Sequence, residues 1–121
     1  MVELALLMPL CLWILLGIVD FGRVFYFNAA ATNAAREGAR YWASNNSATA
    51  TSVKNRVTAE GSPQVTIDPT LVTLSTTGGD RTVQVQFQFS ALTPLIAGLW
   101  GGGPLTVTTA ARMPSLNATG T

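Results

Sequence analysis

The pattern of hydrophobic and polar positions divides the chain into an N-terminal helical part and a β-rich remainder. Residues 4–19 form a run without a charged side chain, about 24 Å long as a helix. Beyond this run, apolar and small residues recur at steps of three and four, which is the spacing of a helix stripe. The stripe comprises Phe21, Val24, Phe25, Ala29, Thr32, Ala35, Ala39 and Trp42. We therefore expect one helix over about residues 3–43, roughly 60 Å long, apolar at 4–19 and amphipathic at 20–43.

Local features refine this helix. Pro9 lacks a backbone N–H, so it should kink the helix or melt one turn. Asp20 and Arg23 are three residues apart and can form an ion pair on one face, and the same spacing predicts a Glu37–Arg40 pair. The polar residues 45–47 are expected to end the helix.

The remainder of the chain alternates in the manner of β-strands. Residues 48–60 predict a short surface helix with Val53 and Val57 on one side. We expect strands at 64–67, 71–76, 81–89 and 105–111, a tight two-glycine turn at 77–80, and a loop at 91–103. The predicted fold class is α+β, with a long N-terminal helix in residues 1–44 and a small antiparallel β-sheet head in residues 45–121.

The composition of the chain argues against several classes of function. Only 11% of the 121 residues are charged, against roughly 25% in soluble domains, and the net charge of +1 predicts no nucleic-acid partner. The chain has no His and a single cysteine, Cys11, which we expect to be a small buried hydrophobe. The sequence lacks an acid–base pair, a metal cluster and a phosphate loop, so we expect no enzyme, no cofactor and no metal site.

The apolar run has three interpretations: a cleavable signal, a permanent membrane span flanked by the interfacial aromatics Tyr26 and Trp42, or a helix buried against copies of itself. The ~78 residues after the helix make a globule about 30 Å across, which cannot cover a helix of about 60 Å. The N-terminal half therefore needs lipid, other chains, or both in succession.

Four segments resemble one protein family: residues 2–6 (VELAL), 8–10 (MPL), 17–23 (GIVDFGR) and 33–41 (NAAREGARY). The sequence is similar there to the TadE-like family, the pseudopilins of tight-adherence (Flp-type) pili, whereas the β part resembles the family only loosely. The resemblance implies a pilin-like fold and a precursor cleaved by a prepilin peptidase. It also implies an inner-membrane assembly platform as partner and a stay in the cytoplasmic membrane before assembly.

Two functions follow from this resemblance. The chain is expected to be a structural pilin subunit, a homopolymer joined through its N-terminal helices in an extracellular type IV or tad-like filament used in adhesion. The alternative is a membrane-anchored minor pseudopilin or an assembly and initiation protein of the pilus machinery.

The candidate assembly contacts are Glu3, Pro9, Asp20, Arg23, Arg36, Glu37, Arg40, Leu99 and Trp100. By the resemblance, Glu3 neutralises the terminal amine of a neighbouring subunit; otherwise it lies at the water interface. Asp20 and Arg23 either form a salt bridge, within the helix or between neighbouring subunits, or belong to a solvated helix turn. The charged residues Arg36, Glu37 and Arg40 either clamp the head to the helix, bridge subunits, or form an exposed helical face.

Two further predictions concern the head. The apolar residues of the 91–103 loop, among them Leu99 and Trp100, either pack on the chain's own head or form an exposed contact surface. Asn45 and Asn117 begin glycosylation sequons, which are short motifs that also arise by chance.

Overall fold

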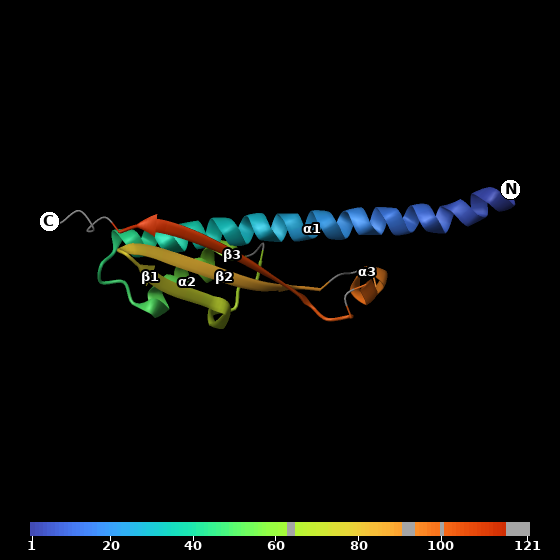
Figure 1. Cartoon of the computed structure of the whole chain (residues 1–121). Helices are drawn as coiled ribbons and strands as arrows, with labels where there is room; N and C mark the ends of the chain where they lie inside the picture. Colours follow the sequence, from blue (N-terminus) through green and yellow to red (C-terminus); the bar gives the residue numbers. More distant parts are fainter. Residues whose placement is uncertain (63–64, 91–93, 100, 116–121) are drawn as a thin grey trace. The chain divides into compact units, whose positions relative to one another are not determined.

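The fold was obtained as a computed structural model that describes residues 1–62, 65–90, 94–99 and 101–115. The elements in chain order are α1 (Val2–Ser44), α2 (Ala50–Gly61), the short 3-10 helix η1 (Pro69–Leu71), β1 (Val72–Thr77), β2 (Asp80–Phe89), α3 (Pro94–Leu99) and β3 (Leu105–Pro114) (Figure 1). The predicted α+β class, with a long N-terminal helix and a small antiparallel sheet, is confirmed.

Helix α1 is continuous over 43 residues and includes Pro9. Of the two outcomes expected at this proline, the melted turn is wrong, because the strong helix formers around Pro9 maintain the helix when one backbone hydrogen bond is lost. The kink stays a prediction. The helix ends where the polar cluster was expected to stop it. There Asn45 N–H donates to Tyr41 O at 3.1 Å, and the Ser44 hydroxyl donates to the same carbonyl.

The chain forms two compact units, and the boundary between them falls within α1. The first unit comprises Met1–Tyr26 and Gln88–Leu105, and the second comprises Phe27–Phe87 and Thr106–Thr121. The division into a helix of residues 1–44 and a head of residues 45–121 stays a prediction.

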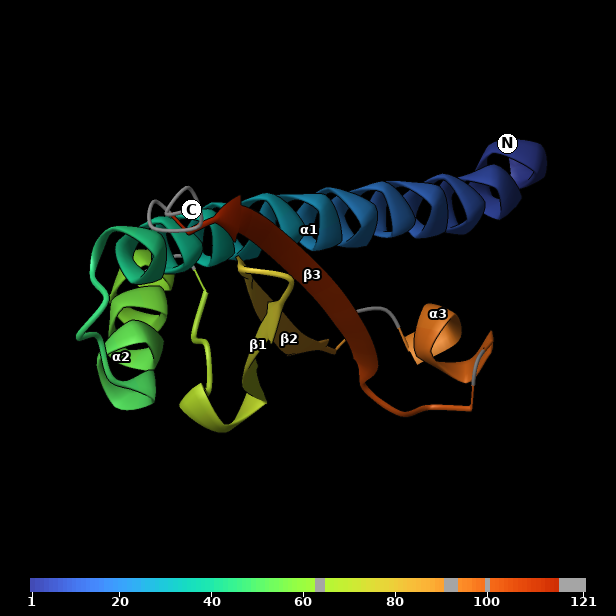
Figure 2. The ribbon, with the colours of Figure 1, turned by 60° about the vertical axis from the view of Figure 1, so that its left-hand side comes forward.

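The second unit contains the hydrophobic core. Small residues of α1 supply its helical side, where Ala31, Ala34, Ala35 and Ala39 are fully buried. Valines of α2 and of the sheet pack against them, with the main contributions from Val53, Val57, Val72, Val83 and Val85. Figure 2 shows α2 and the three strands gathered around the C-terminal part of α1. Small side chains on α1 permit this packing because they let neighbouring backbones approach closely.

The predicted stripe of α1 is correct only in part. Phe21 and Phe25 are 75% and 69% exposed, and Ala29 is also exposed, whereas Ala35 and Ala39 are buried. The fully buried side chains of α1 are alanines. Larger side chains of the helix lie at the edge of the core, where Phe27, Tyr41 and Trp42 are partly buried against it.

The sheet has the order β1-β2-β3, and β1 pairs antiparallel with β2 from Val72↔Val85 to Thr77↔Asp80. The hairpin turn that joins β1 and β2 contains Gly78 and Gly79 at φ values of 60° and 89°. Two consecutive positive φ angles are typical of a type I′ turn, which explains the two glycines. The predicted strand at 81–89 is confirmed, and its alternate residues Val83, Val85, Phe87 and Phe89 are buried.

Two predictions for the head are wrong. Residues 65–67 form no strand: Val65 N–H donates to Gly61 O at 2.8 Å, so Val65 and Ile67 enter the core without joining a ladder. The predicted loop at 91–103 contains α3, which begins at Pro94. Proline suits the first turn of a helix because its φ angle is already helical.

Candidate assembly surface

The outstanding surface of the first unit is the N-terminal part of α1. Every residue from Met1 to Val19 is exposed except Gly17, which is half-buried. The large apolar side chains on this surface include Leu4, Leu6, Leu7, Met8, Leu10, Leu12, Trp13, Ile14, Leu15, Leu16, Ile18 and Val19. The helix is long and apolar enough to cross a membrane by length and composition. Soluble monomers rarely expose an apolar surface of this extent.

Cys11 lies on the same surface and is exposed. The prediction that it is buried is therefore wrong for the single chain, because this part of α1 is not covered by other described segments. Glu3 lies in the first turn of the exposed helix, between the side chains of Val2 and Leu4, which are 80% and 74% exposed. A carboxylate in such an apolar setting requires a partner once the helix enters lipid or a protein core.

The expected Asp20–Arg23 ion pair is present within α1. Arg23 Nη1 lies 3.5 Å from Asp20 Oδ1, and the guanidinium of Arg23 lies 5.3 Å from the ring centroid of Phe89 on β2. Asp20 is only 3% exposed, so it does not belong to a solvated helix turn. The cation–π contact with Phe89 could not be read from the sequence, because it joins residues 66 positions apart.

Glu37 does not form the predicted pair with Arg40. It pairs instead with Arg56 of α2, whose Nη2 lies 3.2 Å from Glu37 Oε1 and 3.2 Å from Glu60 Oε1. Arg56 thus joins α1 to α2. Glu37 was expected to clamp the helix to the head, and it does so by pairing with Arg56 in place of Arg40. The i,i+4 spacing of Arg56 and Glu60 was visible in the sequence, but the contact with Glu37 depends on the packing of the two helices.

Arg36 and Arg40 are exposed on α1 and form no ion pair with residues in the described part of the chain. Their predicted role in bridging subunits stays a prediction. Leu99 of α3 is 77% exposed, so it does not pack on the head. Trp100 lies outside the described residues.

The glycosylation candidate Asn45 is exposed directly after α1, whereas Asn117 lies outside the described residues. Arg81 lies beside Asn45: it donates to the Asn45 carbonyl at 3.5 Å and to Asn46 Oδ1 at 3.0 Å, and its guanidinium is 5.4 Å from the Trp42 ring centroid. Trp42 is half-buried and packs on the core, so its expected role as a second membrane-interface aromatic is wrong.

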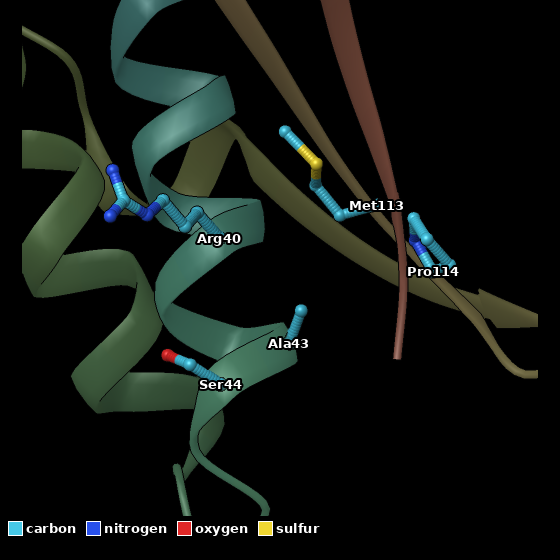
Figure 3. Close-up of a pocket in the computed structure, with 5 residues that line it drawn as sticks. All are labelled: Arg40, Ala43, Ser44, Met113 and Pro114. Atoms are coloured by element: carbon cyan, nitrogen blue, oxygen red, sulfur yellow. The ribbon is translucent and has the colours of Figure 1, made fainter. Parts of the chain in front are cut away.

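A shallow pocket of about 420 Å³ lies between the end of α1 and β3, lined by Arg40, Ala43, Ser44, Met113 and Pro114. Figure 3 shows Ala43 and Met113 facing the space between the helix and the strand, whereas Arg40 and Ser44 point toward the α2 side. Among the described lining residues, the polar side chains of Arg40 and Ser44 therefore do not meet in the space that Ala43 and Met113 face. The described residues also contain no group of His, Cys, Asp and Glu able to hold a metal ion.

The long N-terminal helix and the small antiparallel sheet are consistent with an α+β pilin-like fold, and α1 is a candidate transmembrane helix. Residues 1–40 match the sequence profile of the TadE-like protein family, which confirms the resemblance seen in the N-terminal segments. No curated protein and no solved structure matches the chain. The family and the apolar helix fit a protein associated with the Tad pilus, and the helix suggests membrane anchoring.

Proposed function

We propose that this chain is a structural pilin subunit that polymerises through its N-terminal helix into an extracellular type IV or tad-like filament used in adhesion. The observation that supports this function best is the exposed apolar surface of α1 from Met1 to Val19. Exposing such a surface to water is unfavourable, and packing copies of the helix against one another removes it from water. The chain then acts by packing against its own copies, and we propose no catalytic step, cofactor or nucleic-acid partner for it.

The proposal includes a membrane stage. Before assembly, α1 resides in the cytoplasmic membrane, where a prepilin peptidase processes the precursor and an inner-membrane platform extracts the subunit. Glu3 is the only charged residue before Asp20, and in the assembled state its carboxylate pairs with the terminal amine of a neighbouring copy. Burying a single charge without a partner is costly, so this pairing favours one register between neighbouring helices.

A second function is favoured by the same helix. Because α1 is long and apolar enough to span a bilayer, the chain could remain in the membrane as a minor pseudopilin or an initiation protein. The two functions differ in stoichiometry: a major subunit makes up most of the filament mass, whereas an initiation protein stays in the membrane fraction.

The experiment is to shear pili from cells that express the chain, identify the major subunit by mass spectrometry, and image the filaments for a subunit repeat. Filaments composed mainly of this chain support the structural function. Recovery of the chain only in membranes would contradict that function and support the second one.

Glu3 is tested by Glu3→Leu, with Glu60→Gln as a matched control that removes a carboxylate from the surface of the head. Glu3→Leu should insert into the membrane normally but lose most of its incorporation into filaments, whereas Glu60→Gln should assemble like the wild type. Equal filament yields for Glu3→Leu and the wild type would overturn the role of Glu3.

A further inference from the structure

The charged residues of the first unit are spaced to suit a bilayer. They are Glu3, Asp20 and Arg23, and every other charged residue of the chain belongs to the second unit. Arg23 follows Glu3 by 20 positions, a helical rise of about 30 Å, which equals the thickness of the hydrocarbon core. The rise from Glu3 to Asp20 is only about 26 Å. The better match places the second membrane boundary at Arg23 and leaves Asp20 on the lipid side of it.

The Asp20 carboxylate has a partner within the chain, which makes this position acceptable. Asp20 is 3% exposed, and Arg23 Nη1 lies 3.5 Å from its Oδ1 atom. A paired and covered carboxylate costs much less free energy at a membrane boundary than a lone one. The Arg23 side chain is 36% exposed, so its apolar stem can lie along the helix while its guanidinium reaches the water side. The ion pair therefore straddles the boundary.

Three exposed aromatic residues lie at the same level of α1 as Arg23. Phe21, Phe25 and Tyr26 are 75%, 69% and 54% exposed. Phe21 and Phe25 are four residues apart, so they lie on one face, and the helical period places Asp20 and Arg23 on a different side. The amphipathic ring of Tyr26 suits the membrane–water interface, and the two phenylalanines supply apolar area beside it. Large rings exposed to water are unfavourable, so this group fits the boundary of a bilayer better than free solution.

We infer that Phe21, Phe25 and Tyr26 form an aromatic anchor that lies in the interfacial region of the bilayer and fixes the depth of α1. The inference rests on the membrane stage of the proposed function, and it adds the place of the boundary, which is at Arg23 and not at the end of the uncharged run. Because the anchor acts through its rings, it does not require anionic lipid. The partner of this surface is the lipid interface, and a second copy of the chain is the alternative that the test separates from it.

The test uses the full chain with Cys11→Ser, as a single copy in phosphatidylcholine nanodiscs, and measures how fast one new cysteine reacts with a charged thiol reagent. The three exposed sites are Leu12→Cys within the span, Gly22→Cys at the level of the anchor, and Thr73→Cys on β1. A Cβ atom at position 22 would have nothing within 4 Å, so this substitution preserves the packing. We expect almost no reaction at position 12 and a reaction several-fold slower at position 22 than at position 73, with or without anionic lipid.

The anchor itself is tested by two triple variants at positions 21, 25 and 26, each combined with Gly22→Cys. Phe21→Gln, Phe25→Gln and Tyr26→Gln keep long side chains but remove the rings, and the reaction at position 22 should become several-fold faster. The matched control replaces the same three residues with tryptophan, which also favours the interface, and the reaction should stay slow. Simple shielding by neighbouring side chains would leave both variants slow, which contradicts the anchor.

The outcomes separate the inference from the function on which it rests. A slow reaction at position 12, with position 22 as reactive as position 73, overturns the inference alone. A fast reaction at position 12 overturns the membrane stage as well. Protection of position 22 that requires anionic lipid assigns the contact to Arg23 and contradicts the anchor. Protection that appears only with several copies in each nanodisc also contradicts it and indicates contact with a second copy.

Discussion

Gly38 of α1 lies directly against Val57 of α2, so closely that a Cβ atom at position 38 would overlap the Cγ2 atom of Val57. A glycine within a helix normally costs about 1 kcal/mol relative to alanine. Here it lets α2 pack on α1 and bury Val57 completely. The glycine of the NAAREGAR segment therefore has a packing role between α1 and α2.

This relationship predicts that Gly38→Ala destabilises the protein despite the better helix propensity of alanine. Overpacking costs about 1–3 kcal/mol, so we expect a net loss of about 1 kcal/mol in the free energy of unfolding. The matched control is Gly22→Ala, because a Cβ at position 22 would have nothing within 4 Å in the chain. Urea unfolding of the full chain in detergent, followed by near-UV circular dichroism, measures both variants. Shifts of the same sign would contradict the packing role.

Arg56 should stabilise the head by a small, salt-dependent amount. It pairs with Glu37 and Glu60, but its side chain is 46% exposed, so Arg56→Ala should cost less than about 1 kcal/mol. The difference from the wild type should shrink in about 1 M salt, where the Debye length is about 3 Å. Lys54→Ala, on the same helix, serves as a control. A cost for Arg56→Ala that is the same at low and high salt would show that packing, and not charge, is responsible.

The alternation in β2 predicts that truncating adjacent residues changes the stability by very different amounts. Phe87 is 4% exposed in the core, whereas Gln88 is exposed. Phe87→Ala should cost about 3–5 kcal/mol, because it leaves a cavity, and Gln88→Ala should change stability by less than about 0.5 kcal/mol. Comparable losses in unfolding midpoint for the two variants would show that the strand's register differs from the one described.

Asp68 should titrate below its ordinary range. The Thr70 hydroxyl donates to Asp68 Oδ1 at 2.6 Å and the Thr70 backbone N–H donates at 2.8 Å, and these bonds lower the pKa of Asp68 from its ordinary value of 3.8. Because the folded pKa is the lower one, the stabilisation is complete above about pH 3.8 and is lost as the pH falls through the folded pKa.

The measurement is a titration of the Asp68 carboxyl carbon by NMR, in the wild type and in Thr70→Val. The valine removes the hydroxyl, which is the largest cause of the shift, and keeps the backbone donor. We expect the midpoint to rise toward 3.8 in Thr70→Val. An unchanged midpoint would assign the shift to the backbone N–H alone.

The sequence by itself determined the elements whose causes are local. The long helix, the helix that contains Val53 and Val57, the two-glycine turn and the alternating strand β2 all follow from spacing and turn chemistry within a few residues. The Asp20–Arg23 pair was predictable for the same reason. The N-terminal family resemblance was also local, because it rests on residues 1–40.

Only the tertiary structure decided which side of α1 is buried and which partners its charges take. Alanine, glycine and aromatic residues all fit the period of a helix, so the period does not show which of them are buried. The close approach of α2 and the sheet buries the face that carries the alanines and leaves Phe21 and Phe25 exposed. Glu37 took Arg56 in place of Arg40, and Val65 joined the core without a strand, because these contacts connect segments far apart in the chain. Periodicity shows that a helix has two faces, but only packing against the rest of the molecule determines which face is covered.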